Sequence, residues 1–502
     1  MKSLGVIISL YLIYLVTTHP TEKVTYNGNQ LWKITNDNKT TLKLLKTLAK
    51  EKYLTLWALN AKKVDAMIDH KYVTQVKEKL LENNQKYEVS IEDVQKAIDE
   101  ANPKPQEDLD GRKGYRLTWN YYHNLDDIYD YLHYLEATFP KLCTVTTIGD
   151  SVEGRPIKLL RISNKNPNNK AVFVEGGIHA REWISPAAVT YIINQLISNY
   201  DDEPSYIKNL DWYFVPVLNP DGYTYTYNVD RLWRKNRAQS KTSDCVGVDL
   251  NRNWGYDWGS NGSSTDPCSN SYRGTKPFSE PETASVAKFF INNPDIQWVG
   301  YLAVHSYGQF IVYPWGDPNR IVEDYEDLND AGIQAAENIL SAGGETYTVG
   351  PAGLVIYKAT GISMDWAKGS QAIKYVFTIE LRDKGNYGVL LPAKYIKVAS
   401  EEALIVVRTV AQTINNLSRI IQGGGEPYTV GPVGIVLYKA SGSSMDWAKG
   451  SAAIKFSFTL ELRDRGQYGF ILPAQFIKPS SEEALILVRV VAEAAAKTFT
   501  KK

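Results

Sequence analysis

Apolar and polar positions along the chain follow a mixed helix and strand pattern in residues 22–110. Short apolar runs alternate with lysine-rich stretches, and an acidic residue three positions after a serine is typical of a helix start. The apolar runs are Gln30 to Ile34 and Tyr53 to Leu59. We expect helices near Thr41 to Lys50, near Val64 to Asp69, and from the Ser90-x-x-Asp93 signal to Ala101. This mixture predicts a small α+β domain.

From about Tyr115 the pattern changes to apolar strands that alternate with helices. Leu125 to Phe139 is strongly amphipathic and predicts a helix. Predicted strands are Ile157 to Ser163, Ala171 to Glu175, Trp212 to Val217 and Trp298 to Leu302, and predicted helices are Ser185 to Tyr200 and Glu280 to Ile291. Because the strands are apolar throughout, we expect an α/β sheet buried on both faces.

The segment Ala101 to Arg116 separates these two regions. Its prolines and glycines predict a linker, and its basic residues Arg112, Lys113 and Arg116 make it a target for proteases. A chain of 502 residues is also too long for a single core of ordinary size. We therefore expect separate units at residues 22–110 and 115–421.

The C-terminal part contains a repeat. Gly343 to Ala411 matches Gly424 to Ala492 without a gap at an offset of 81 residues (438 − 357 = 81). Two such units are too few for a solenoid, which needs three or more to bury a core. Residues 424–502 are therefore interpreted as a duplicate of the end of the preceding domain. A duplicated exon explains it, either as two alternative ends joined in one reading frame or as a true extension.

The N-terminus and the overall charge bear on location and partners. Lys2 followed by the apolar run Leu4 to Val16 is typical of a secretory signal peptide, here residues 1–20, although a buried N-terminal helix remains an alternative. No later segment is long and apolar enough to cross a membrane. The formal net charge of zero gives no reason to expect binding to nucleic acid or to an anionic membrane. We expect a secreted monomer.

Three cysteines remain, and in an oxidising compartment two of them should pair. Cys245 and Cys268 flank a loop rich in Asn, Gly and Ser, so they are the expected pair, and closing that loop is worth roughly 3 kcal/mol. Cys143 would then be free and buried.

Two of the six histidines lie where a sheet binds ligands. His179 follows the strand that ends at Glu175 and stands three residues before Glu182, and His305 follows the strand from Trp298. Open α/β sheets bind ligands at the carboxyl ends of strands. Two His and one carboxylate leave a fourth position open, as in catalytic zinc sites. On these residues alone, two structural histidines are an equally good interpretation.

Several motifs resolve this ambiguity. The chain from about residue 25 to Gln412 resembles the pancreatic-type zinc carboxypeptidases of the A and B kind. Motifs that carry the resemblance are Gly177 to Ile184, Asn219 to Tyr223, Leu232 to Arg237, Gly247 to Trp254, Val304 to Tyr307 and Phe377 to Asp383. Their order and spacing both fit. The resemblance implies a mixed eight-stranded twisted sheet with helices on both faces, preceded by a small antiparallel α+β pro-domain.

The resemblance also implies roles for individual residues. His179, Glu182 and His305 would bind Zn²⁺, the ligand set known from carboxypeptidase A, and Asp249 would orient His179. Glu380 would be the general base on the attacking water, and Arg237 would stabilise the oxyanion. The remaining implied substrate-binding residues are Asn251, Arg252, Tyr357 and Arg181. Asn251, Arg252 and Tyr357 would bind the terminal carboxylate of a peptide, which explains removal of single C-terminal residues.

Specificity and regulation follow from the same resemblance. Met364 would lie at the base of the specificity pocket, where the basic-specific branch has Asp, so we expect a preference for apolar C-terminal residues. Ile362 stands where the family usually has Gly, and its bulk would favour aliphatic residues. The first unit would be an inhibitory pro-segment, released by a trypsin-like protease, and digestion in a gut lumen is plausible.

Two other functions compete with an active exopeptidase. A catalytically inactive relative would bind peptide ends without cleaving them, but such a protein is expected to lose residues such as Glu380 and Arg237, and both are present. A structural zinc protein would need a fourth protein ligand, and the sequence offers none near the others.

Overall fold

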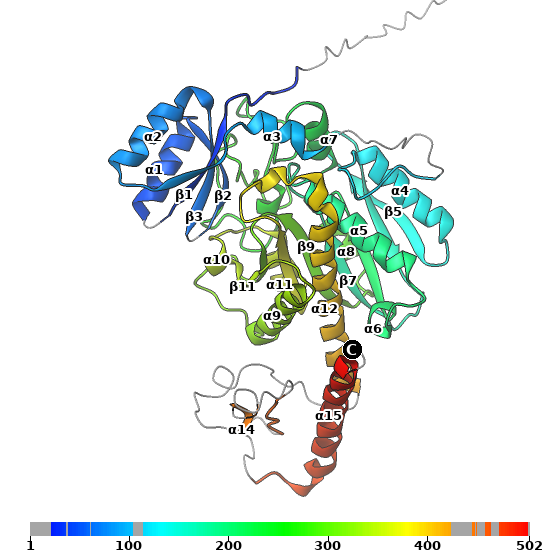
Figure 1. The fold of residues 1–502 in the computed structure, drawn as a ribbon. Coiled ribbons are helices and arrows are strands. Elements are labelled where there is room, and N and C mark those ends of the chain that lie inside the picture. Colours follow the sequence, from blue (N-terminus) through cyan, green and yellow to red (C-terminus); the bar gives the residue numbers. More distant parts are fainter. Residues whose placement is uncertain are drawn as a thin grey trace, which may run out of the picture.

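The computed structural model describes residues 22–36, 39–60, 62–103, 114–422, 444–446, 448, 457–462 and 471–499 (Figure 1). The predicted signal peptide and the predicted cleavage sites Arg112 and Lys113 lie outside these residues. Arg116 is described and exposed. Among the helices that the structure describes, none combines the length and the apolar character needed to span a membrane.

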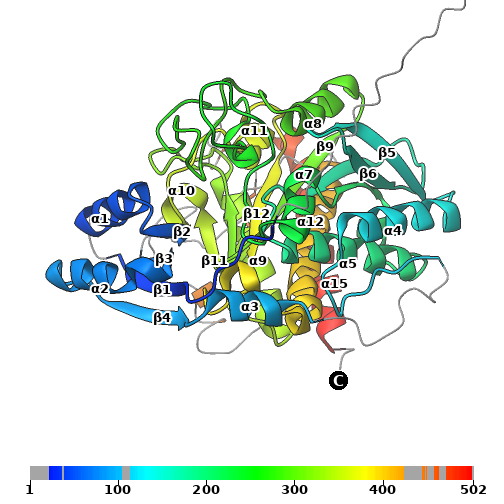
Figure 2. The same ribbon diagram turned by 90° about the horizontal axis from the view of Figure 1, so that it is seen from above.

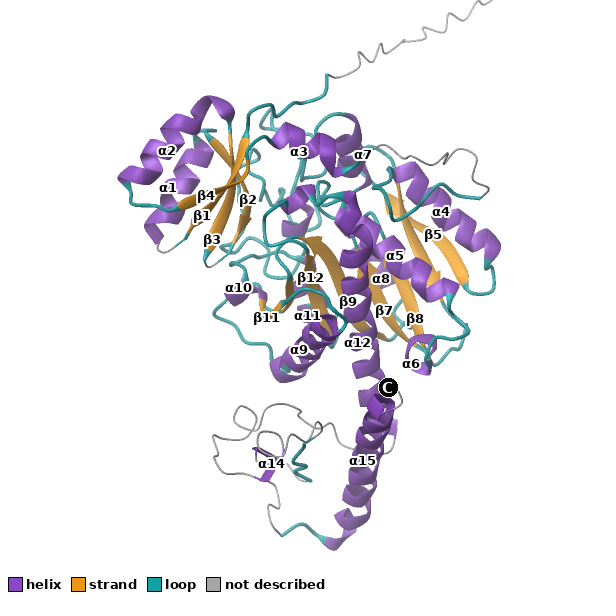
Figure 3. Cartoon of the chain, in the orientation of Figure 1, coloured by secondary structure: helices purple, strands orange, loops and turns teal. Residues whose placement is uncertain are grey.

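The N-terminal unit is a four-stranded antiparallel sheet with the order β2-β3-β1-β4. Its elements are β1 (Gln30–Thr35), α1 (Lys39–Lys50), β2 (Leu54–Leu59), β3 (Lys63–Ile68), the short 3-10 helix η1 (His70–Tyr72), α2 (Val73–Glu82), β4 (Tyr87–Ile91) and α3 (Val94–Ala101). Figure 3 shows α1 and α2 on the outer side of this sheet, with the larger unit on its other side. The antiparallel α+β fold predicted for this region is confirmed.

Two local predictions in this unit are wrong. Val64 to Asp69 is not a helix, because Lys63–Ile68 forms β3. Both faces of β3 are buried, one against the helices and one against the larger unit, so its sequence shows no alternation of apolar and polar residues. Ser90 does not cap a helix but lies in β4, whereas the Asp93 side chain accepts a hydrogen bond from the backbone N–H of Lys96 at the start of α3.

The larger unit is built on an eight-stranded mixed sheet with the order β11-β10-β12-β9-β7-β8-β6-β5. The strands are β5 (Cys143–Asp150), β6 (Pro156–Ile162), β7 (Lys170–Glu175), β8 (Leu210–Val215), β9 (Trp298–Ser306), β10 (Phe310–Tyr313), β11 (Thr348–Pro351) and β12 (Tyr375–Leu381). The four central strands, β12, β9, β7 and β8, are parallel. This confirms the predicted eight-stranded sheet.

Helices cover both faces of this sheet (Figure 2). The helices are α4 (Leu125–Thr138), α5 (Ile184–Ser198), α6 (Ser205–Lys208), α7 (Pro220–Asn228), α8 (Pro281–Asn292), α9 (Tyr325–Ser341), α10 (Ala352–Val355), α11 (Ser363–Gly369) and α12 (Ile396–Gln422), with 3-10 turns η2 (Leu250–Arg252), η3 (Gly388–Leu390) and η4 (Ala393–Tyr395). One buried cluster joins α4, α5, α9 and α12 to the sheet, and a second joins α8 and α11 to the other face. Alternate residues of β7 enter opposite clusters, as in a sheet buried on both sides.

Cys245 and Cys268 form the predicted disulfide, with an S–S distance of 2.01 Å, and Cys143 is free and buried. The bridge lies in the long connection between α7 and α8.

Parts of the second repeat copy are also described. They are α14 (Ser444–Asp446), the 3-10 turn η6 (Ala474–Phe476), α15 (Ile477–Phe499) and residues 457–462, which form no strand. Helix α15 contacts α12 and projects away from the eight-stranded sheet (Figure 1).

The turn after β7 requires glycine at position 177. Gly177 has a φ of +63°, and a Cβ there would lie 3.1 Å from Pro216 O and from Val217 Cα. Gly154 has a similar φ of +79° but open space around the same position, so it is a matched control.

We expect Gly177→Ala to destabilise the protein more than Gly154→Ala. Each change should cost about 1–2 kcal/mol from the left-handed backbone, and Gly177→Ala should cost more because backbone atoms must move. Urea unfolding of both variants measures the difference. Equal free energies of unfolding would show that crowding at this turn is unimportant.

Candidate metal centre and active site

The turn between β7 and α5 carries two of the three predicted ligands. β7 ends at Glu175, a turn of two glycines follows, and His179 and Glu182 precede the start of α5 at Ile184. His305 lies near the end of β9, which pairs with β7 in the sheet. Because both strands are parallel, their carboxyl ends bring these side chains to the same edge of the sheet.

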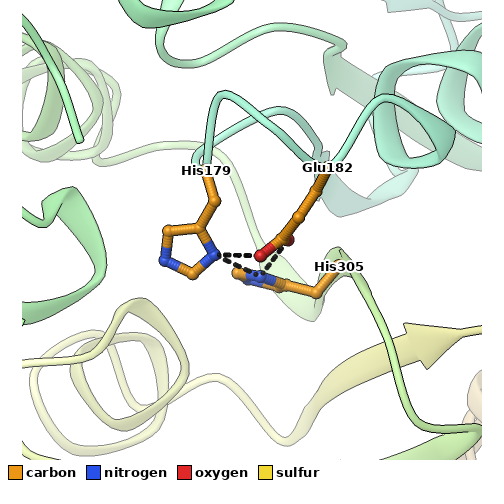
Figure 4. Close-up of side chains that lie close together, drawn as sticks. All are labelled: His179, Glu182 and His305. Carbon is orange, nitrogen blue, oxygen red and sulfur yellow. Dashed lines mark hydrogen bonds and ion pairs between the residues drawn. The ribbon is translucent and has the colours of Figure 1, made fainter. Parts of the chain in front are cut away.

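The three side chains converge on one point (Figure 4). His179 Nδ1 lies 2.8 Å from Glu182 Oε1, His305 Nδ1 lies 3.2 Å from Glu182 Oε2, and the two Nδ1 atoms lie 3.2 Å apart. Atoms that bind one zinc ion at about 2.1 Å in a tetrahedral arrangement lie roughly 3.4 Å apart. All three residues are buried, and two imidazoles with one carboxylate form a donor set that suits Zn²⁺.

Asp249 orients His179. Its Oδ1 lies 3.2 Å from His179 Nε2, so that nitrogen is engaged and Nδ1 points at the other ligands. Asp249 is fully buried, and burial alone would disfavour its charge. The guanidinium groups of Arg234 and Arg252 outweigh this effect and hold the pKa of the carboxyl well below its usual range. Asp249 therefore remains an acceptor for the imidazole.

Glu380 lies beside the ligands. β12 pairs in parallel with β9, and Glu380 is the register partner of His305. Burial raises the pKa of Glu380 to about 7, with a further increase from the charge of Glu182 and opposition from His305. A carboxyl group whose pKa lies near neutrality is suited to accept and then release a proton.

The side chain of Arg237, predicted to stabilise the oxyanion, lies against residues other than the predicted ligands. Its guanidinium stacks on Tyr225 and Trp233, with centroid distances of 3.7 Å and 4.5 Å, and lies 3.7 Å from Glu153. None of these residues belongs to the ligand cluster. Arg237 instead packs on two aromatic rings next to α7.

Arg234 occupies the place expected for Arg237. Its Nη2 donates to Asp249 Oδ2 at 3.0 Å, and its Nη1 lies 3.5 Å from Glu182 Oε1. The two arginines are three residues apart in the same motif, and their side chains contact different groups. Both arginines belong to the motif, and of the two, Arg234 contacts a predicted ligand.

The residues predicted to bind a terminal carboxylate lie together. Arg252 Nη2 donates to Tyr357 Oη at 2.9 Å, and Arg252 Nη1 donates to the backbone oxygen of Asn251 at 2.6 Å. Asn251 Oδ1 accepts a hydrogen bond from the backbone N–H of Ser363, the first residue of α11. A buried guanidinium therefore lies beside a hydroxyl and an amide, a suitable set for a carboxylate.

The region around Met364 is a row of side chains on one face of the sheet. Strand pairing places Glu175, Ala303, Thr378 and Val312 side by side. Met364 covers this row, since its Sδ lies 3.5 Å from Thr378 Oγ1. Glu175 was not predicted from the sequence, although an acidic residue at the end of an apolar strand was a signal for it. Burial raises its pKa, which favours the neutral form.

Ile362 is buried next to Gly316. A Cβ added to Gly316 would lie 2.9 Å from Ile362 Cδ1 and 2.4 Å from the backbone oxygen of Ala359. Because glycine has no side chain, the side chain of Ile362 can fill the space next to Gly316. This space lies near the row of side chains that Met364 contacts.

The N-terminal unit reaches this site. Arg181 Nη2 lies 3.4 Å from the backbone oxygen of Trp57, and Tyr307 Oη donates to Asp65 Oδ2 at 2.7 Å. Apolar residues of both units also form one buried cluster: Leu31, Trp57, Met67, Ile91 and Val94 from the first, and Leu232, Tyr307, Val389 and Leu390 from the second. A predicted substrate-binding residue, Arg181, is therefore engaged by the N-terminal unit. The peptide bond between Ser306 and Tyr307 is cis.

Comparisons with known proteins agree with this geometry. A family model described as zinc carboxypeptidase matches residues 128–406 and, a second time, residues 400–486. A model described as carboxypeptidase activation peptide matches residues 32–101. Among curated proteins, carboxypeptidase B of Astacus astacus is 41% identical over 301 residues, which cover 60% of this chain and 99% of that protein. Carboxypeptidase A1 of Bos taurus is 36% identical over 409 residues, which cover 79% and 96%.

Solved structures share the fold. The crystal structure of thrombin activatable fibrinolysis inhibitor matches with a TM-score of 0.70 and 32% identity, over 77% of this chain and 98% of that one. The carboxypeptidase A from Helicoverpa armigera matches with a TM-score of 0.69 and 28% identity, again over 77% and 98%. The chain therefore belongs to the zinc carboxypeptidase family, and an activation peptide precedes its enzyme domain.

Proposed function

We propose that this chain is the secreted precursor of a carboxypeptidase that removes single apolar residues from the C-termini of peptides and proteins. The observation that carries the proposal is one cluster of two imidazoles and a carboxylate beside Glu380 and Arg234. Secretion is supported by the apolar run Leu4 to Val16 and by the disulfide, which needs an oxidising compartment.

His179, Glu182 and His305 would hold the zinc ion, with Asp249 fixing the ring of His179. When bound, zinc supplies a Lewis acid and lowers the pKa of water. The protein contributes three buried ligands, and the contact with Asp249 leaves Nδ1 of His179 facing Glu182.

Glu380 and Arg234 supply the other two elements of peptide hydrolysis. Glu380, with its pKa near neutrality, accepts the proton of the attacking water and passes it to the departing amine. Arg234 lies beside Glu182 and carries a fixed positive charge, so it stabilises the negative charge that develops on the carbonyl oxygen.

The Arg252 cluster accounts for action at a chain end. Arg252, Asn251 and Tyr357 offer a charged fork, an amide and a hydroxyl within one small region. A free carboxylate satisfies all three groups, whereas an internal peptide bond brings no charge to balance the arginine.

The side chains near Met364 support a preference for aliphatic residues. The row of Ala303, Thr378 and Val312 offers little charge, and burial favours the neutral form of Glu175. The side chain of Ile362 takes up volume beside this row of side chains. A Lys or Arg side chain would leave its charge unpaired there, which is costly.

The N-terminal unit is proposed to inhibit the enzyme until a trypsin-like protease removes it. It occupies Arg181 with the Trp57 carbonyl and Tyr307 with Asp65. A catalytically inactive relative remains the alternative, but the presence of both Glu380 and Arg234 argues against it. For a structural zinc site, the described residues supply three ligands and no fourth protein ligand.

An assay on peptides tests the proposed function. After treatment with trypsin, the protein should release C-terminal Leu or Ile faster than Phe, and both much faster than Arg or Glu. Addition of a zinc chelator should abolish release, and added zinc should restore it. Faster release of Arg than of Leu would contradict the proposed specificity, and no release of any residue would contradict the function.

Substitution of the two arginines tests which one stabilises the oxyanion. Arg234→Ala should lower kcat roughly 100- to 1,000-fold, the usual cost of losing such a donor. Arg237→Ala should leave kcat nearly unchanged, because its partners are Tyr225, Trp233 and Glu153. Zinc content of both variants controls for folding. A greater loss in Arg237→Ala would restore the assignment made from the sequence.

The Asp65 contact predicts that inhibition depends on pH. Burial raises the pKa of Asp65 to about 6 from an ordinary value of 3.8. Docking of the N-terminal unit thus takes up a proton, so inhibition is weakest above the raised pKa and strengthens as the pH falls through it. The activity of the intact precursor, relative to the same sample after trypsin, should fall roughly tenfold between about pH 7 and pH 5.

Asp65→Asn is the matched variant for this measurement. Its amide oxygen still accepts the hydrogen bond from Tyr307 but does not titrate in this range. The activity of the intact precursor relative to the trypsin-treated sample should therefore no longer depend on pH. An unchanged pH profile would show that another group is responsible.

A further inference from the structure

The element that carries Glu380 exists twice in this chain. Residues 343–411 recur as residues 424–492 at an offset of 81 without a gap. In the first copy, β12 lies inside the sheet, between β9 and β10, and the side chains of Phe377, Ile379 and Leu381 are all 0% exposed. The first copy therefore completes the core and brings Glu380 to His305.

The second copy forms the same local structure at the same offset. The turn η6 and helix α15 begin at Ala474 and Ile477, which are the counterparts of Ala393 and Ile396 at the starts of η4 and α12 (393 + 81 = 474, 396 + 81 = 477). Helix α14 begins at Ser444, the counterpart of the first residue of α11. Local sequence thus encodes these elements without help from the sheet.

One side-chain contact also recurs. Thr459 Oγ1 lies 3.7 Å from Met445 Sδ, and in the first copy Thr378 Oγ1 lies 3.5 Å from Met364 Sδ. The segment that corresponds to β12 therefore already lies against its own short helix, as β12 lies against α11.

The second copy lacks the burial that β12 has. Phe458, Leu460 and Leu462 are the counterparts of Phe377, Ile379 and Leu381, and they are 65%, 39% and 45% exposed. Residues 457–462 form no strand. This apolar row has a known complement in the molecule, namely the space between β9 and β10 that the first copy fills with nearly the same side chains.

We propose that the second copy can take the place of the first in the same chain, so that it enters the sheet between β9 and β10 and brings Glu461 to the ligand cluster. The proposal rests on the role proposed for Glu380, since Glu461 is its counterpart. Expulsion of the first copy leaves a longer loop, but loop closure depends only weakly on length. The two forms make nearly the same contacts.

Sequence differences favour the first copy. Val376, fully buried in β12, is replaced by Ser457, whose hydroxyl would have to be buried. The form with the second copy docked is thus the less populated one, and any damage to the first copy should shift the population toward it.

Aspartate substitutions at equivalent positions of the two copies, made in the full-length chain, test this exchange. Phe377→Asp places a charge in the middle of β12 and prevents the first copy from docking. The variant should still unfold cooperatively and bind one zinc per chain, because the second copy replaces the first. Phe458→Asp should behave as the unchanged protein, and Phe377→Asp combined with Phe458→Asp should lose both the cooperative transition and zinc. If Phe377→Asp alone behaves like the double variant, the proposal is wrong.

Glu461→Gln then tests the chemistry. In the otherwise unchanged chain it should have no effect, whereas combined with Phe377→Asp it should lower the remaining activity at least roughly 100-fold. Equal activity of Phe377→Asp with and without Glu461→Gln would overturn the role of Glu461. Size-exclusion chromatography distinguishes exchange within one chain, which gives a monomer, from insertion into a second molecule, which gives a dimer. A folded Phe377→Asp variant found only as a dimer would contradict exchange within the chain. If the chain proves to have no peptidase activity, unfolding and zinc content still decide the exchange.

Discussion

The active site depends on the register of three parallel strands. β9 pairs with β7 on one side and with β12 on the other, so His305 stands between the turn that carries His179 and Glu182 and the strand that carries Glu380. A slip of one residue in either pairing would turn these side chains to the opposite face of the sheet. Residues nearly 200 positions apart meet because the backbone hydrogen bonds allow one register (380 − 182 = 198).

Charge balance follows from this register. The turn after β7 and strand β12 bring two carboxylates, Glu182 and Glu380, close together, and a third, Asp249, comes from the start of η2. Burial disfavours the charge of all three groups. The neighbouring imidazoles outweigh burial at Glu182, and nearby guanidinium groups, Arg234 among them, outweigh it at Asp249, whereas at Glu380 burial prevails and raises the pKa to about 7. Similar groups thus acquire different proton affinities from their surroundings.

The sequence predicted those parts of the fold and site that local patterns encode. Apolar strands ending at Glu175 and before His305 placed the ligands at the edge of a sheet, and the motifs supplied Asp249 and Glu380. The contact of Arg234 with Glu182 was not predicted, because two arginines three residues apart belong to the same motif and only their aromatic or acidic neighbours distinguish them. β3 was missed because the contact between the two units buries its second face, and a single sequence does not show which surfaces meet.

The repeat shows, within one molecule, which elements are determined by local sequence and which depend on long-range contacts. Two copies of nearly the same sequence begin helices at equivalent residues, yet residues 376–381 lie in strand β12, whereas their described counterparts 457–462 form no strand. Helix starts depend on hydrogen bonds within a few residues, so they appear in both contexts. A strand needs backbone hydrogen-bond partners and burial for its side chains, and the sheet provides one such position, between β9 and β10. Which glutamate lies beside the ligand cluster therefore depends on which copy occupies that place, and not on the sequence around the glutamate itself.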